Sequence, residues 1–180
     1  MKTLTLLRHA KSGWNDPVAR DFDRPLNDRG RRAADTMGHH LRALGLSFDH
    51  VVASPAVRVV ETVLDVAKGY GRALDPHFDR RIYLASGVTL LDIVTAFPDS
   101  ASRALMVGHN PGLEDLALML VPDAGDNDLR DTLETKYPTA TLAEITLDID
   151  RWADAAIGAG TLARFIRPRD LDPALGPDDD

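Results

Sequence analysis

Apolar runs that end abruptly in polar or charged residues recur along this chain. The first run, Thr3 to Leu7, leads directly into Arg8 and His9. Short runs of aliphatic and β-branched residues are typical of buried strands. A strand here would carry a cation and an imidazole at its C-terminal end, where ligands bind in open α/β sheets. In the simpler interpretation, both residues only end the strand and face water. The later segments of the chain weaken that interpretation.

A second apolar run covers residues 48–53 and is followed by a Ser-Pro pair at 54–55. Serine is a good N-cap and proline suits the first helical position, so we predict a helix over 56–68. Arg58 then lies in the first helical turn, where free N–H groups and the helix dipole attract anions. The alternative for Arg58 is an ordinary salt bridge to Glu61 on the same helix.

The third run, Arg103 to Val107, meets the turn 108–112, which contains His109 and precedes an expected helix over 113–120. Taken alone, His109 can equally be a loop histidine that caps or packs. Because strand, polar turn and helix follow one another repeatedly, the pattern predicts an α/β fold. We expect three layers, with a mostly parallel central sheet flanked by helices.

The rest of the chain supplies one long loop and several ordinary elements. The loop, 10–27, has no clear period, contains Arg24, and is of a length often used for binding. Asp28 is the expected cap of the next helix, and residues 74–84 are ambiguous. Expected helices cover 28–44 and 87–97, the polar segment 122–136 includes a short helix, and the last strands cover 139–147 and 161–166. We expect one domain over residues 1–170 and a frayed acidic tail over 171–180.

Composition excludes several kinds of function. The formal net charge of −7 argues against general nucleic-acid binding. Without cysteine, disulfides and thiolate metal sites are impossible. The chain has no apolar run long enough to cross a bilayer and no signal-peptide pattern, so we expect a cytoplasmic protein without a membrane partner. His39 and His40 diverge by about 100° on a helix and are expected to be surface histidines rather than metal ligands.

Three strand ends thus offer Arg8 with His9, Arg58, and His109. If the strands are neighbours, two guanidiniums and two imidazoles converge with no obvious buried carboxylate among them. Such a cluster repels itself unless an anion with several oxygens fills it, and phosphate matches guanidinium geometry. A neutral imidazole beside phosphorus can act as a nucleophile. The chain has neither a P-loop pattern nor a metal-carboxylate cluster, so we expect a mechanism without a metal or other cofactor.

The motifs at these three strand ends resemble those of the histidine phosphatase superfamily, which has the phosphoglycerate-mutase-like fold. They are Leu7-Arg8-His9-Ala10, then Ser54-Pro55-Ala56-Val57-Arg58-Val59-Val60-Glu61-Thr62, and Val107-Gly108-His109-Asn110-Pro111-Gly112. Four further segments are similar to the short SixA-type phosphohistidine phosphatases: 11–14, 23–30, 136–139 and 165–169. The resemblance covers nearly the whole chain.

The resemblance implies a role for each matching position. His9 would be the nucleophile that becomes phosphorylated. Arg8, Arg58 and His109 would hold the phosphoryl group, and Arg24 in the long loop would close over it. For Arg24 the alternative is an ordinary surface charge.

A general acid is the missing part of this pattern. Many members of the superfamily have an acidic residue after the second motif or an aspartate directly after the late histidine. At the latter position this chain has Asn110, which cannot donate a proton as an acid. An imidazole leaving group has a conjugate acid with a pKa of ~6.5 and leaves without a strong acid, so phosphohistidine is a sensible substrate. The remaining candidate acids are Asp16, Asp21, Asp79 and Glu114.

We therefore expect a metal-independent phosphohydrolase that acts on phosphohistidine in a partner protein. A phosphorelay protein and a phosphotransferase carrier protein are both candidate partners, and the compact chain favours a monomer. One alternative is a phosphatase of a small phosphorylated metabolite. The other is a non-catalytic phosphate-binding module, which would not need His9 as a nucleophile.

Overall fold

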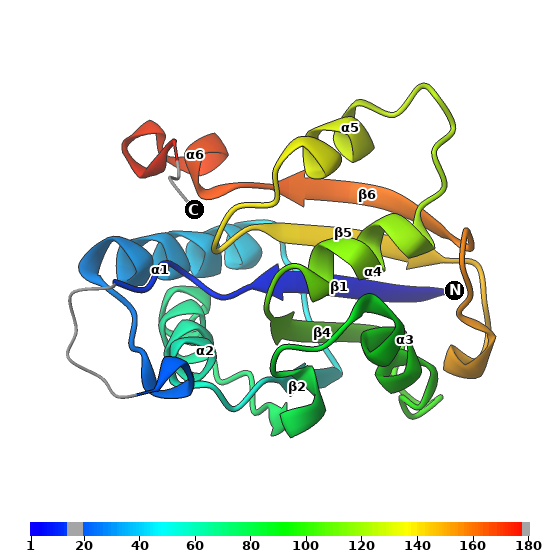
Figure 1. Ribbon diagram of the computed structural model, residues 1–180, viewed down its shortest axis with the longest axis horizontal. Coiled ribbons are helices and arrows are strands. Elements are labelled where there is room, and N and C mark those ends of the chain that lie inside the picture. Colours follow the sequence, from blue (N-terminus) through cyan, green and yellow to red (C-terminus); the bar gives the residue numbers. More distant parts are fainter. Residues whose placement is uncertain (14–19, 178–180) are drawn as a thin grey trace.

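The computed structural model describes residues 1–13 and 20–177. Six strands in this part of the chain form one sheet in the order β3-β2-β4-β1-β5-β6 (Figure 1). The strands are β1 (Lys2–Arg8), β2 (His50–Ala53), β3 (His77–Phe78), β4 (Arg103–Gly108), β5 (Leu142–Leu147) and β6 (Gly160–Ile166). The first four strands run parallel, and β5 and β6 are antiparallel to their neighbours. The expected mostly parallel sheet is confirmed.

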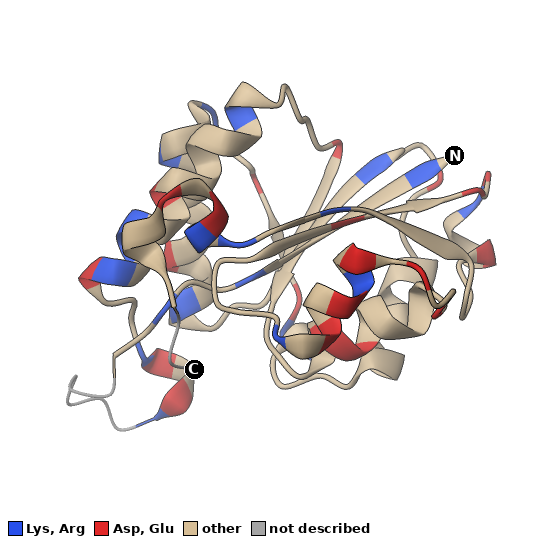
Figure 2. Cartoon of the chain, turned by 90° about the horizontal axis from the view of Figure 1, so that it is seen from above, with Lys and Arg blue, Asp and Glu red and all other residues tan. Residues whose placement is uncertain are grey.

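Helices cover both faces of this sheet, so the fold has three layers (Figure 2). The α-helices are α1 (Asp28–Ala43), α2 (Val57–Tyr70), α3 (Gly87–Thr95), α4 (Gly112–Leu120), α5 (Asp128–Thr135) and α6 (Pro168–Leu171). Alternate residues of β4 point to opposite faces: Val107 packs in the core with α1 and α2, and Met106 in the core with α3 and α4.

Glycines allow α1 and α2 to approach each other closely. A Cβ at Gly38 would lie 2.1 Å from the carbonyl oxygen of Val66, and one at Gly69 would lie 2.2 Å from that of Asp35. Glycine often ends a helix, but Gly69 lies within α2, where it allows close contact with α1. The helix ends instead at Gly71, whose φ of +85° suits glycine.

Two predicted helix caps are wrong. Asn27, not Asp28, caps α1, because its side chain accepts a hydrogen bond from the backbone N–H of Gly30 at 2.8 Å. The helix expected to start behind Ser54 begins at Val57, and its N-cap residue makes no side-chain capping bond. The hydroxyl of Ser54 is used in the site described below.

The end of the chain is more ordered than expected. A 3₁₀ turn covers Pro173–Leu175, and Leu175 is 6% exposed in the core beside α1 and α2. The prediction of a frayed tail is therefore wrong as far as residue 177. The strand expected from residue 139 begins at 142, because Ala140 has a φ of +56° and its N–H donates to the carbonyl of His9.

Candidate active site

The strand order brings three polar segments to one edge of the sheet. β4 lies between β1 and β2 and runs parallel to both, so the three C-terminal ends coincide. Backbone hydrogen bonds continue just past the strands: His9 N–H donates to the carbonyl of Gly108 at 3.0 Å, and Ser54 N–H to that of Val107 at 3.1 Å. The residues that follow each strand therefore start side by side.

A cavity of about 390 Å³ opens at this edge. All five site residues expected from the sequence line it: Arg8, His9, Arg24, Arg58 and His109. The other described residues that line it are Lys11, Ser12, Leu84, Asn110 and Thr139, and of these only Asn110 was singled out from the sequence, as the residue in place of an acid. Lys11, Ser12 and Thr139 belong to segments that resemble the SixA-type phosphatases, and this resemblance could have indicated them as site residues. Nothing in the sequence indicated Leu84.

His9 is buried as a neutral imidazole of fixed tautomer. Its Nδ1–H donates to the carbonyl of Ala10 at 2.7 Å, which leaves the lone pair on Nε2. Burial, and then the charges of Arg8 and Arg58, hold the pKa of His9 well below its usual value, although the bond to Ala10 opposes them. The ring centroids of His9 and His109 are 5.3 Å apart. At neutral pH, Nε2 is unprotonated and can attack an electrophile.

A buried threonine connects the His9 turn to α2. Thr62 is fully buried; its Oγ1 accepts from the backbone N–H of Ala10 at 2.9 Å and donates to the carbonyl of Arg58 at 2.7 Å. One hydroxyl therefore fixes the backbone beside the imidazole relative to the first turn of α2.

His109 is also neutral, with its proton on Nε2. Arg58 Nη2 donates to His109 Nδ1 at 3.4 Å, and His109 Nε2–H donates to Ser54 Oγ at 2.8 Å. Burial and the charge of Arg58 lower the pKa of His109 to about 4, against the opposing charge of Asp21. Ser54 thus orients an imidazole instead of capping a helix.

Arg58 is 4% exposed and turned toward the long loop. Its Nη1 and Nη2 donate to Asp21, at 2.9 Å to the carbonyl oxygen and 3.1 Å to Oδ2. The alternative pairing with Glu61 does not occur, because Glu61 Oε1 accepts from the backbone N–H of Leu26. The Nε of Arg58 is buried without a hydrogen-bond partner among the described residues, so an anion oxygen would satisfy it.

Asp21, a candidate acid in the sequence, is the carboxylate partner of the arginines, a contact that the sequence did not indicate. Its Oδ1 accepts from Arg24 at 3.1 Å, and its Oδ2 accepts from the hydroxyl of Tyr83 at 2.7 Å. Burial alone would raise the pKa of Asp21, but the Tyr83 bond and the charges of Arg58 and Arg24 outweigh it and lower the pKa. Asp21 is therefore ionised at neutral pH and cannot act as a general acid.

A backbone carbonyl organises the other side of the cavity. The oxygen of Tyr137 accepts from Arg8 Nη1 at 2.9 Å and from Asn110 Nδ2 at 3.0 Å. The Tyr137 hydroxyl, buried, donates to the carbonyl of Leu6 at 2.7 Å and so anchors this segment to β1. These contacts give the segment 136–139 a physical role, because its backbone positions the side chains of Arg8 and Asn110.

Known proteins share these features. A sequence profile of the histidine phosphatase superfamily (branch 1) matches residues 4–83. A protein of Mycobacterium tuberculosis is 33% identical over 91% of this chain and 100% of its own length. This chain belongs to the histidine phosphatase superfamily. Its membership and its fold make it a phosphohydrolase.

Solved structures of histidine phosphatases agree with this assignment. A protein named as a phosphohistidine phosphatase SixA from Nakamurella multipartitia superposes with a TM-score of 0.79 at 30% identity, covering 93% of this chain and 96% of its own. A protein with the same name from Agrobacterium tumefaciens superposes with a TM-score of 0.75 at 27% identity, covering 93% of this chain and 98% of its own. A protein histidine phosphatase SixA complexed with tungstate superposes with a TM-score of 0.77 at 19% identity, covering 94% of this chain and 99% of its own. This likeness shows that the two proteins have the same fold.

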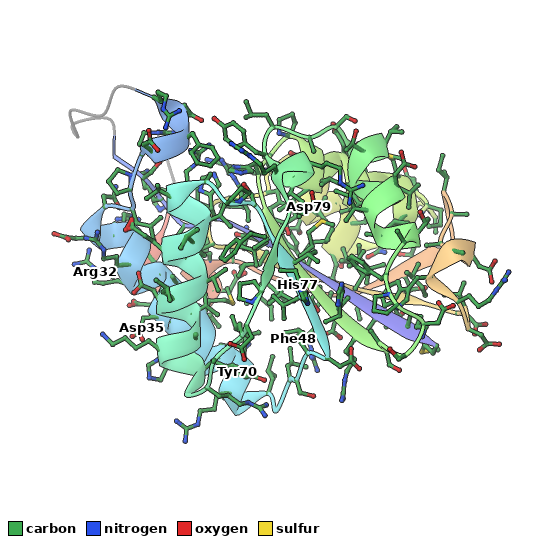
Figure 3. All side chains as sticks on the ribbon, turned by 90° about the horizontal axis from the view of Figure 1, so that it is seen from below. Arg32, Asp35, Phe48, Tyr70, His77 and Asp79 are labelled. Atoms are coloured by element: carbon green, nitrogen blue, oxygen red, sulfur yellow. The ribbon has the colours of Figure 1, made fainter. Side chains whose placement is uncertain are left out.

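Of the other candidate acids, Asp79 and Glu114 do not line the cavity of this histidine phosphatase. Asp79, just past β3 (Figure 3), is bound by Arg81 at 2.6 Å, and that hydrogen bond lowers its pKa. Burial raises the pKa of Glu114, but Glu114 does not line the cavity. Asp16 lies outside the described residues.

Over residues 1–13 and 20–177, no three His, Asp or Glu side chains are grouped so that they could hold a metal ion. His39 is exposed on α1, where its Nδ1 is hydrogen-bonded to the carbonyl of Asp35. In the same part of the chain, no helix is both long and apolar enough to span a membrane.

Proposed function

We propose that this histidine phosphatase removes phosphate from phosphohistidine in a partner protein through a phosphorylated His9, without a metal ion. One observation carries the proposal: a neutral imidazole of fixed tautomer lines the same cavity as Arg8, Arg58 and His109. The cavity combines a nucleophile with groups that match the oxygens of a phosphoryl group.

In the first step, Nε2 of His9 attacks phosphorus and forms a new P–N bond. The bond from phosphorus to the leaving imidazole breaks and its electron pair stays on the leaving nitrogen, so the ring, which is protonated on its other nitrogen, departs as a neutral imidazole. Arg8 and Arg58 stabilise the charge on the equatorial oxygens. Arg24, from the long loop, closes over the same group.

In the second step, water attacks the phosphorus of phosphorylated His9 and releases phosphate, which returns the lone pair to Nε2. His109 takes part through its charge. Burial and the charge of Arg58 disfavour its protonation, but a bound phosphate dianion reverses the sign of the nearest charge. Phosphate binding then favours uptake of a proton from solvent at Nδ1 of His109, which donates to a phosphate oxygen instead of accepting from Arg58.

Phosphohistidine suits this site because none of the described residues that line it is a strong acid. Asp21 is ionised, and the position after His109 holds an amide. A leaving imidazole needs little protonation, since its conjugate acid has a pKa of ~6.5, whereas an alkoxide needs a strong acid. The likeness at 27–30% identity to proteins named as phosphohistidine phosphatases supports this choice. A phosphorelay protein or a phosphotransferase carrier would supply the substrate.

The test compares turnover of a histidine-phosphorylated carrier protein with turnover of a simple alkyl phosphate, in the absence and presence of a chelator. We expect much faster turnover of the phosphoprotein, and no effect of the chelator. His9→Ala should reduce turnover at least about 1000-fold while vanadate still binds, because the arginines and His109 remain. His77→Ala, which removes an exposed imidazole that does not line the cavity, is the matched control.

Other outcomes would contradict the proposal in distinct ways. Equal or faster turnover of alkyl phosphates would favour a metabolite phosphatase. Retained turnover in His9→Ala would exclude the covalent step. Phosphate binding without turnover, and without a phosphorylated His9 after rapid mixing and quenching, would indicate a binding module.

A further inference from the structure

Leu84 is an anomaly in this site. It lines the cavity, yet it is 67% exposed and its φ is +53°. The other described residues that line the cavity have polar or charged side chains or are histidines. A branched side chain disfavours the left-handed backbone region, and water disfavours an exposed isobutyl group. Leu84 is therefore in an unfavourable position on both counts in the free protein.

The surrounding structure fixes this conformation. Ile82 is 1% exposed and packs so closely on Gly108 that a Cβ there would lie 2.9 Å from Ile82 Cγ2. A Cβ at Gly112 would lie 2.3 Å from the carbonyl oxygen of Ala85. Both glycines flank His109, so the side chain of Ile82 and the backbone of Ala85, on either side of Leu84, pack against the turn that holds this imidazole. Strained residues persist where the neighbouring structure enforces them, and they concentrate at functional sites.

A third contact ties the same segment to the anion-binding arginines. The hydroxyl of Tyr83 donates to Asp21, and Asp21 accepts from Arg58 and Arg24. The residue next to Leu84 is thus joined to the guanidiniums through one carboxylate. Leu84 is held at a set position relative to the place where a phosphoryl group would bind.

Exposed apolar surface continues beyond the cavity. Val88, at the start of α3, is 61% exposed. It lines a shallow hollow of about 460 Å³ between α3 and α4, together with Leu118 and Met119. A partner that reached from the cavity across Leu84 would meet further apolar side chains in this direction.

We infer that Leu84 contacts the substrate protein and selects a phosphohistidine that has an apolar side chain beside it. This inference rests on the proposed function and names the part of the substrate that the arginines do not recognise. The phosphoryl group occupies the cationic floor, so the flanking residue of the partner must pass the rim at Leu84. Contact there removes apolar surface of both side chains from water.

The experiment uses two phosphohistidine peptides that differ only in the residue beside the phosphohistidine, leucine in one and serine in the other. We expect the wild type to prefer the leucine peptide by about tenfold in kcat/KM, which is about 1.4 kcal/mol. Leu84→Asn and Leu84→Gly, which both tolerate the left-handed region, should reduce the preference to about twofold or less. Leu64→Asn changes a leucine that is 63% exposed outside the cavity and should leave the preference intact.

Because the preference is a ratio measured on one enzyme, partial misfolding of a variant does not alter it. Turnover of phosphoramidate, which is too small to touch the rim, should stay within about twofold in both Leu84 variants. A wild type without preference, or Leu84 variants that retain it, would overturn the inference and leave the proposed function standing. Equal losses on phosphoramidate and peptide would also overturn it. A wild type inactive on all three substrates would refute the proposed function itself.

Discussion

The burial of His109 should make the stability of this protein depend strongly on pH. The pKa of His109 is lowered to about 4 in the folded protein, because of burial and the charge of Arg58, from an unfolded value of 6.5. As pH falls, the unfolded chain binds this proton first. The stabilisation is therefore fully present above pH 6.5 and is lost as pH falls toward 4. The difference corresponds to about 3 kcal/mol at neutral pH.

The perturbation is His109→Gln, which removes the titrating group and keeps a polar side chain. The wild-type free energy of unfolding should fall between pH 6.5 and 4, with His9 contributing in the same direction because its pKa is also lowered by burial. In His109→Gln the slope over this window should be smaller by up to about 1.4 kcal/mol per pH unit, the value for one proton. The absolute stability also changes when the bond to Ser54 is altered, so the slope is the decisive quantity.

The assay is urea unfolding followed by circular dichroism at half-unit pH steps. The buffers must contain no phosphate, because an anion that binds the folded state stabilises it. His39→Gln, at a side chain that is 65% exposed on α1, controls for loss of an imidazole. Parallel stability curves for wild type and His109→Gln between pH 4 and 6.5 would refute the argument that His109 is buried in its neutral form.

Three further predictions concern activity and packing. The acid limb of kcat/KM should lie well below pH 6.5, because burial lowers the pKa of His9; a limb at or above that value would contradict this. Thr62→Val should cost about 1–3 kcal/mol in urea unfolding and reduce kcat, since it leaves the N–H of Ala10 buried and unsatisfied. Gly38→Ala should lower stability by about 1–3 kcal/mol, because its Cβ would meet the carbonyl of Val66, and unchanged thermal unfolding would exclude that contact.

The sequence predicted the strand ends well because each signal is local. An apolar run that stops at Arg8 and His9, or before His109, marks both the strand and the position of its polar end. Parallel strands share a C-terminal edge, so the same pattern that predicts the fold class also predicts that these side chains meet. The structure places β4 between β1 and β2, the order that brings the ends closest together.

The remaining part of the site depends on contacts between distant segments, which no local pattern reports. Asp21 comes from a loop without period and binds Arg58 on α2. The carbonyl of Tyr137 binds Arg8, although the two residues lie far apart in the sequence. A backbone oxygen has no residue type, so its role cannot be deduced from sequence letters even where the motif around it is noticed.

The predictions that failed near the site share one physical cause. Ser54 is a strong N-cap by residue type, but its hydroxyl accepts from His109, and α2 begins without a side-chain cap. Ala140 should extend a strand, yet its left-handed backbone donates its N–H to the carbonyl of His9. In both cases a polar group that could have capped a helix or extended a strand forms a hydrogen bond that positions His109 or His9. A helix cap contributes about 1 kcal/mol, whereas a buried imidazole N–H left without a partner would cost about 1–3 kcal/mol, so the hydrogen bond to the imidazole prevails.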